Sequence, residues 1–191
     1  MTKQHWQTIG KIGLLGIGFL VLTRLLSEFA FQLAYPVFQS LSAFDPDGSF
    51  LYISLHHILQ GLFALFAILL LSRIFRTSLK DFGFNLNEWR YAVRLVVQFS
   101  LFWFFLQGSV GVLMMVFSDT SAAFQFPLTA RNFGGYFAFQ ILLSGTSEEV
   151  LFRALVMAPL LIIGKRAGLP EKSSTLLAGG IATLIFMLAH I

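Results

Sequence analysis

Two long apolar runs without a charged side chain restrict what this chain can fold into. The first extends from Phe50 to Ser72 and the second from Leu95 to Phe117, each with 23 residues and no Asp, Glu, Lys or Arg. Uncharged runs of about 18 or more residues predict transmembrane helices. Only 12% of the 191 residues are charged, against about a quarter in soluble domains. We therefore predict an all-α, polytopic transmembrane helical bundle.

Hydropathy divides the chain into about five expected spans, near residues 9–33, 50–72, 91–117, 133–164 and 173–191. No small-residue cleavage site follows the first span, so we interpret it as a retained helix rather than a signal peptide. The chain has no cysteine, which excludes disulfides, thiolate metal sites and a cysteine nucleophile.

The number of basic residues is high and low in turn along the successive connecting segments. From the N-terminus onward, these segments carry 2, 1, 5, 1 and 3 Lys or Arg, with Lys11, Arg24 and Arg94 inside the neighbouring spans included in the count. Cytoplasmic segments carry the excess of basic residues, so this alternation predicts a cytoplasmic N-terminus in an integral, multi-pass membrane protein. In a bacterium it would lie in the inner membrane. We therefore attribute the net charge of +4 to basic residues that set the orientation of the chain in the lipid bilayer. We expect no nucleic-acid partner.

Three charged side chains lie inside the span expected at 133–164, in the stretch SEEVLFR. That span would form roughly 48 Å of helix against a ~30 Å hydrocarbon core, so we expect it to tilt, bend or break near SGTS at 144–147. Glu149 and Arg153 have the i, i+4 spacing of an ion pair, whereas Glu148 lies about 100° away around the helix. We predict that Glu149 pairs with Arg153 and that Glu148 stays available for acid or base chemistry. The alternative is that all three charges pair only to hold the bundle.

His190 lies deep in the last expected span, with Phe186 one helical turn before it. Fifteen residues separate it from Thr175, and fifteen separate Glu149 from Gly164, so both groups lie some 22 Å from the cytoplasmic edge at about 1.5 Å per residue. The short loop KRAGLPEK makes the two helices antiparallel neighbours. We therefore expect the glutamates and His190 to meet, as an acid/base pair around one water. A hydrogen-bonded packing role for His190 is the alternative.

Two other pairs of polar residues fall inside spans. Arg24 and Glu28 have the spacing to pair at the outer membrane surface. His56 and His57 begin the second span, and adjacent residues diverge by about 100°, so they cannot chelate one ion from one helix face. We expect an interfacial role for these two histidines.

The stretches EEVLFR and FMLAH together resemble two motifs of the CAAX prenyl protease and bacteriocin-processing family, also called CPBP or Abi. In the first, an Arg follows a pair of Glu, five positions after the first of them; in the second, a His follows a Phe by four. DFGFNLNEW resembles a weaker upstream signature. The resemblance covers 79–191, which we interpret as a partial domain of this family, and residues 1–78 supply two N-terminal spans.

The resemblance implies an intramembrane endopeptidase that cleaves a peptide or protein substrate presented at the membrane. By motif, Glu148 and His190 would activate the attacking water, while Glu149, Arg153 and Phe186 would support the site. We favour a mechanism without a metal because the chain has no His-Glu-x-x-His sequence and no evident set of three ligands. A divalent metal remains the alternative.

The resemblance stops at residue 191. The family's third motif, a His followed four residues later by Asn or Asp, has no match here, and 17 residues from Thr175 to Ile191 give about 25 Å of helix, short of a full crossing. We interpret the chain as C-terminally truncated and expect its catalysis to be impaired. The alternative function is a non-enzymatic membrane protein of the same fold, acting in bacteriocin immunity or as a scaffold.

Overall fold

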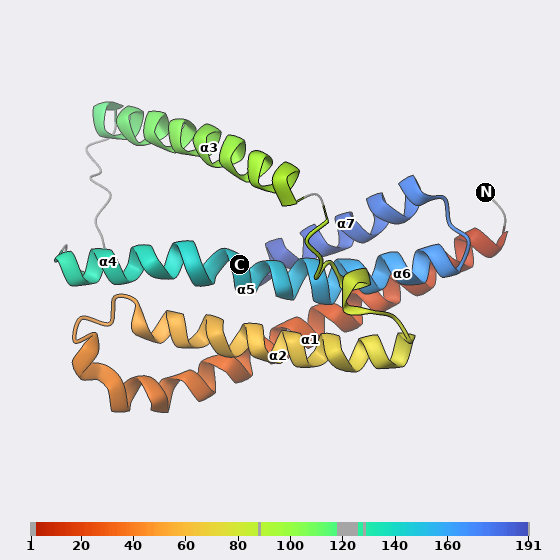
Figure 1. Ribbon diagram of the computed structural model, residues 1–191, viewed down its shortest axis with the longest axis horizontal. Coiled ribbons are helices and arrows are strands. Elements are labelled where there is room, and N and C mark those ends of the chain that lie inside the picture. The colour runs from red at the N-terminus through yellow and green to blue at the C-terminus, as the bar shows by residue number, and fades with distance from the viewer. Residues whose placement is uncertain (1–2, 88, 118–125, 128, 191) are drawn as a thin grey trace. The chain divides into compact units, whose positions relative to one another are not determined.

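A computed structural model describes residues 3–87, 89–117, 126–127 and 129–190, and every regular element in these ranges is a helix (Figure 1). The chain divides into two compact units. One unit comprises Met1–Phe84 with Phe126–Ile191, and the other comprises Asn85–Gln125. The all-α prediction is thereby confirmed for the described residues.

In the described residues, the larger unit contains four long helical segments besides its short connecting helices. They are α1 (Lys3–Leu41), α2 (Leu51–Phe75) and a stretch of continuous helix over residues 130–166, followed by α7 (Glu171–Ala189). The 130–166 helix consists of α4 (Ala130–Phe139), the π-helix η3 (Gln140–Ser144), α5 (Gly145–Glu148), the π-helix η4 (Glu149–Met157) and α6 (Ala158–Arg166). Two 3₁₀ helices, η1 (Ser42–Phe44) and η2 (Leu79–Phe82), lie in the loops. The smaller unit contains α3 (Trp89–Phe117).

Three segments of the described chain are long and apolar enough to cross a membrane. They are Trp6–Phe44, Leu51–Phe75 and Glu171–Ala189, which correspond to α1 with η1, α2 and α7. Only 22%, 17% and 22% of their apolar windows is buried inside the protein, so most of their apolar side chains face outward. This outward apolar surface fits a membrane protein. The count of five spans is not confirmed and stays a prediction.

The 130–166 helix does not break at SGTS, while a tilt or bend there stays a prediction. The helix continues through these residues, with π-helical turns at Gln140–Ser144 and again at Glu149–Met157. A π-turn contains an extra residue and changes the face on which the following side chains lie, and such turns are common at functional sites. The helix therefore adapts its winding around Glu148 without losing continuity.

The loop between α1 and α2 is organised by the fully buried carboxylate of Asp45. Its two oxygens accept hydrogen bonds from the backbone N–H groups of Ser49, Phe50 and Leu51, at 2.7–2.9 Å, and from the Ser49 hydroxyl at 2.9 Å. Burial alone raises the pKa of Asp45, but these four hydrogen bonds together lower it below its ordinary value of 3.8. The same contacts satisfy N–H groups that the first turn of α2 leaves without helical partners.

The start of the 130–166 helix is tied to that same loop. Thr129 caps α4 by accepting a hydrogen bond from the Asn132 backbone N–H at 3.2 Å. The buried side-chain amide of Asn132 donates to Asp47 Oδ2 and to the Pro127 carbonyl, each at 2.8 Å. This end of the helix is therefore fixed against the α1–α2 connection.

The turn from α6 to α7 sets the two helices antiparallel and close together, as the short loop predicted. Gly168 has a φ of +73°, which favours glycine, and the Leu169 N–H closes the end of α6 on the Gly164 carbonyl at 3.1 Å. A Cβ on Gly164 would lie 2.8 Å from Ser174 Oγ on α7. The approach of the two helices here therefore requires glycine.

The apolar core of the larger unit lies where η4 packs against α2 and α7. Its fully buried side chains come from each of these helices and from α1 and η2, including Ile12, Ile68, Phe82, Leu151 and Leu155. Polar residues interrupt this core next to the centre of the 130–166 helix. Those residues form the candidate site.

Candidate active site

Glu148 and His190 face each other across the interface of the 130–166 helix and α7. Glu148 is the last residue of α5, His190 directly follows α7, and their Oε1 and Nε2 atoms are 3.9 Å apart. Their side chains are 28% and 50% exposed, respectively. Both line a cavity of about 200 Å³. The predicted meeting of these two side chains is thus present in the fold, whereas their catalytic roles stay predictions.

The ring of His190 is oriented by a backbone hydrogen bond. Its Nδ1 lies 2.8 Å from the carbonyl oxygen of Phe186. A carbonyl can only accept, so Nδ1 carries the hydrogen, and in neutral His190 the lone pair is on Nε2, the atom that faces Glu148. Phe186 also packs on the His190 ring at 4.3 Å and on the ring of Phe152 at 5.1 Å. Phe186 therefore supports the site through both its backbone and its ring.

Glu149 and Arg153 form the predicted ion pair, with 2.9 Å between Oε2 and Nε. The pair faces another side of the helix, because both residues line a separate cavity with the loop residues Phe82, Gly83 and Phe84. Their side chains are 56% and 72% exposed. The two adjacent glutamates therefore diverge as the helical spacing predicted, and the ion pair stays outside the Glu148–His190 cavity.

One wall of the Glu148–His190 cavity is polar and comes from α1 and α2. Gln60 donates through Nε2 to the Ser27 hydroxyl at 3.1 Å, and that hydroxyl lies 3.2 Å from His56 Nε2. The ring of His56 also stacks on Phe31, with centroids 3.5 Å apart. Gln60 Oε1 and His56 Nδ1 are buried and have no hydrogen-bond partner in the part of the chain that the structure describes. Buried polar groups are normally paired, so this wall retains unused hydrogen-bonding capacity.

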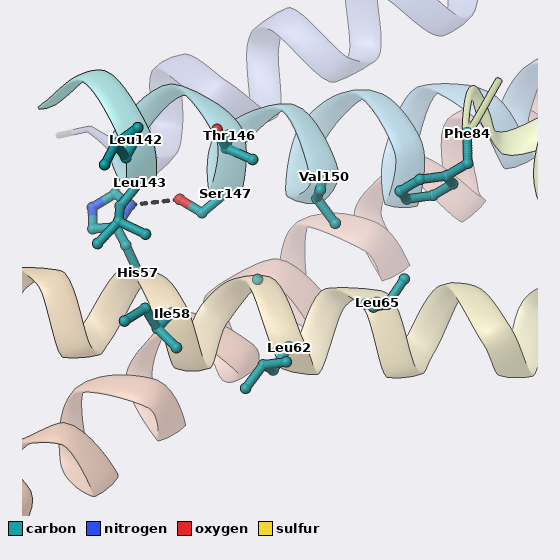
Figure 2. Close-up of a pocket in the computed structure, with 11 residues that line it drawn as sticks. His57, Ile58, Leu62, Leu65, Phe84, Leu142, Leu143, Thr146, Ser147 and Val150 are labelled. Carbon is teal, nitrogen blue, oxygen red and sulfur yellow. Dashed lines mark hydrogen bonds between the residues drawn. The ribbon is translucent and has the colours of Figure 1, made fainter. Parts of the chain in front are cut away.

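His57 separates this polar cavity from a second, apolar one. Its Nδ1 lies 2.6 Å from the hydroxyl of Ser147, which itself donates to the Ser144 carbonyl at 3.1 Å. The Ser147 hydroxyl is thus the acceptor, His57 Nδ1 carries the hydrogen, and its Nε2 is left as an acceptor. Figure 2 shows this hydrogen bond at one end of the second cavity. His57 lines both cavities, whereas Ser147 is a lining residue of the second one.

The second cavity has a volume of about 250 Å³ between α2 and the 130–166 helix. Leucine, isoleucine, valine and phenylalanine side chains from both helices and from the loop after η2 line it (Figure 2). Its apolar lining residues are Ile58, Leu62, Leu65, Phe84, Leu142, Leu143 and Val150. A polar cavity and an apolar cavity therefore adjoin each other through His57.

Arg24 on α1 is the remaining charged residue of the polar cavity. It does not pair with Glu28 as its spacing suggested, because Glu28 Oε1 accepts a hydrogen bond from Gln32 at 3.0 Å instead. Arg24 Nη1 lies 3.4 Å from the Ala189 carbonyl, next to His190. Packing of α1 against α7 directs Arg24 across the interface rather than along its own helix.

Sequence reasoning missed the contribution of α1 and α2 to this site. His56 and His57, expected at the membrane interface, are instead buried between helices at 4% and 9% exposure. Both can face inward because α2 lies between α1 and the 130–166 helix, so a wide arc of its surface is covered. The available signal was the i, i+4 spacing of His56 and Gln60 within an uncharged run, which places two polar side chains on one face.

The described part of the chain contains no group of three or more His, Asp or Glu side chains arranged to hold a metal ion. Metal independence stays a prediction. The polar cavity instead brings together one carboxylate, one guanidinium and three imidazoles, from Glu148, Arg24, His56, His57 and His190. Such a set can bind water, transfer protons and stabilise negative charge.

Comparison with known proteins adds no relative. No protein-family model, no curated protein and no solved structure matches the chain. The resemblance to the CAAX prenyl protease and bacteriocin-processing family therefore depends on the two short motifs, and the functional argument depends on the site itself.

Proposed function

We propose that this chain is a multi-pass membrane protein with intramembrane endopeptidase activity, in which Glu148 and His190 activate the attacking water. The observation that carries this proposal is the 3.9 Å separation of Glu148 Oε1 and His190 Nε2 within one cavity. The two groups come from different helices, 42 positions apart in the sequence. Two groups so far apart in the sequence meet through the packing of two helices, not through the residue spacing within one helix.

The hydrogen-bonding roles of the two groups define what lies between them. An ionised Glu148 and a neutral His190 both present acceptors, and 3.9 Å is too long for a direct hydrogen bond. One water that donates a hydrogen to each acceptor satisfies both. That water is polarised toward hydroxide, which is the role of a general base in peptide hydrolysis.

The hydrolysis uses these two groups in sequence. The water oxygen forms a bond to the carbonyl carbon of the substrate while its proton passes to the Glu148–His190 pair. The C–N bond then breaks, the carbonyl re-forms, and the pair returns the proton to the leaving amine. No further reactant is required, and the free carboxylate and amine are the products.

The substrate class follows from the neighbouring cavity. Its volume of about 250 Å³ and apolar lining suit a large apolar side chain on a peptide segment. Because His57 lines both cavities, an apolar side chain bound in the second one would lie next to the cavity that holds Glu148 and His190. We infer an apolar residue near the scissile bond of a peptide presented from the membrane.

The test is cleavage of quenched fluorescent peptides by purified protein in detergent. Prenylated C-terminal peptides and apolar leader peptides form two arms, each assayed with the 191-residue chain. We expect cleavage in one arm and a loss of about 10²–10⁴-fold in Glu148→Gln. The matched control is Glu28→Gln, which removes an α1 carboxylate outside the cavity.

Unchanged turnover in Glu148→Gln would remove that residue from the mechanism. An immunity phenotype that persists in the Glu148→Gln variant would favour the non-enzymatic alternative.

The same proposal includes five membrane crossings and a cytoplasmic N-terminus. It counts α3 and the 130–166 helix as the two further spans, because α3 is 29 residues long and the second reaches about 55 Å. Since the chain has no cysteine, a cysteine introduced into any loop is its sole thiol. Labelling of such variants with a membrane-impermeant maleimide should place loop 45–50 outside and loops 77–87 and 167–170 on the cytoplasmic side, because two crossings separate the last two loops. Labelling of all three loops from one side would overturn this topology.

A further inference from the structure

Arg24 forms no ion pair with any carboxylate of the described residues. It lies near the middle of α1, inside the Trp6–Phe44 segment that is apolar enough to cross a membrane. Glu28 is hydrogen-bonded to Gln32, and no carboxylate in the described chain forms an ion pair with Arg24. Charged residues inside membrane spans are costly and commonly mark functional positions. The position of Arg24 therefore calls for an anionic partner.

The surroundings of Arg24 indicate where that partner would be. Its side chain lines the same cavity of about 200 Å³ as Glu148 and His190. Among the described residues, Arg24 forms a single, long hydrogen bond of 3.4 Å from Nη1 to the carbonyl of Ala189, the residue before His190. A guanidinium has five N–H donors, so most of them remain available to a group bound in the cavity.

We propose that Arg24 is a catalytic residue of this site, whose guanidinium donates hydrogen bonds to the oxyanion formed during peptide hydrolysis. This inference rests on the proposed function. When the water oxygen bonds to the scissile carbon, the carbonyl π electrons move onto the oxygen, and the water proton moves to the Glu148–His190 pair. The negative charge on that oxygen is greatest in the transition state, so a fixed cation there accelerates the reaction. Breaking of the C–N bond re-forms the carbonyl and releases Arg24.

A structural role for Arg24 is the competing explanation, since its contact with Ala189 could hold the end of α7. The two roles differ in what they require. The structural contact needs only an N–H donor, which a glutamine amide also provides, whereas oxyanion stabilisation needs the positive charge. They also differ kinetically, because a charge that forms only in the transition state affects kcat rather than KM.

The experiment compares Arg24→Gln, Arg24→Lys and Arg24→Ala on the peptide found to be cleaved, with Arg73→Gln as the control for loss of an exposed arginine. Oxyanion stabilisation predicts a loss of about 10²–10³-fold in kcat for Arg24→Gln at an unchanged KM. We expect Arg24→Lys to retain part of the activity, and guanidinium chloride at low millimolar concentration to restore part of it to Arg24→Ala. Thermal unfolding in detergent should be the same for Arg24→Gln and Arg73→Gln.

A binding measurement makes the test independent of turnover. In the Glu148→Gln background, a phosphinate isostere of the cleaved peptide, which carries a tetrahedral anion, should bind more tightly than the peptide itself. Arg24→Gln should abolish this preference. Equal kcat in Arg24→Gln and wild type, or a preference for the phosphinate that survives Arg24→Gln, would overturn the role of Arg24 while Glu148-dependent cleavage stands. Absence of all cleavage by wild type would overturn the proposed function and this inference together.

Discussion

Two regions of the larger unit bury a set of polar groups around a carboxylate, and they differ in how completely those groups are paired. In the α1–α2 loop, Asp45 receives four hydrogen bonds and is fully buried. In the cavity between the helices, Glu148 lies 3.9 Å from His190, and the adjoining wall leaves Gln60 Oε1 and His56 Nδ1 without partners. The first region is closed to any ligand, and the second is open to one.

The difference separates a carboxylate that is fully used by the fold from one that is free for the catalytic role we propose. A fully paired polar group stabilises its surroundings and has no capacity left for a substrate. Unpaired buried groups are costly to stability, and proteins retain such features at functional sites. Asp45 therefore organises the start of α2, whereas Glu148 keeps the freedom that proton transfer requires.

The largest effect that tests this comparison is loss of activity in His190→Gln. Glutamine retains hydrogen-bonding capacity but cannot exchange a proton near neutral pH, so we expect cleavage to fall by about 10²–10⁴-fold with little change in thermal unfolding. The measurement is kcat/KM on the cleaved peptide, with His5→Gln as the control. A parallel loss of stability would place His190 among the structural groups instead.

Asp45→Ala should give the next largest effect, on stability rather than chemistry. It removes the acceptor of three backbone N–H groups at the start of α2, and we expect a loss of about 2–3 kcal/mol in the free energy of unfolding. Denaturant titration in detergent micelles measures it. Asp47→Ala, which removes only the hydrogen bond from Asn132, should cost about 1 kcal/mol, and equal losses from both variants would contradict the central role given to Asp45.

We expect the free energy of unfolding to depend on pH through the ionisation of Asp45. Its pKa is lowered in the folded protein relative to the ordinary value of 3.8, so protons bind more tightly to the unfolded chain. The resulting stabilisation is complete above the unfolded pKa and is lost as the pH falls through the folded pKa. Unfolding of wild type and Asp45→Asn across the acidic range should therefore converge at low pH. A constant difference between them would show that charge is not involved.

The smallest effect should come from Glu149→Gln. The Glu149–Arg153 pair is 56% and 72% exposed, and exposed i, i+4 pairs contribute about 0.3–0.5 kcal/mol. We expect a stability change of that order, together with a smaller loss of cleavage than in Glu148→Gln. If Glu149→Gln instead matched Glu148→Gln in activity, the two adjacent carboxylates would act as a unit despite facing different cavities.

Part of the site could be predicted because it depends on local helix geometry. The spacing of Glu149 and Arg153 places them in contact on any α-helix, and the divergence of Glu148 from Glu149 follows from the same rotation per residue. The meeting of Glu148 with His190 could also be predicted, since a short loop between antiparallel helices fixes their relative depth. These inferences use only the rise per residue and rotation per residue of a helix and the length of the connecting loop.

The sequence by itself determined that the chain is helical and apolar, and it located the Glu148–His190 pair. Only the tertiary structure decided that Arg24, Ser27, His57 and Gln60 complete the cavity around that pair. The reason is that apolar side chains of α2 are distributed around the whole helix, so no hydrophobic stripe indicates which face turns inward. The rotation of such a helix about its axis is set by its neighbours, and that rotation brings His57 to Ser147 and opens the polar wall toward Glu148.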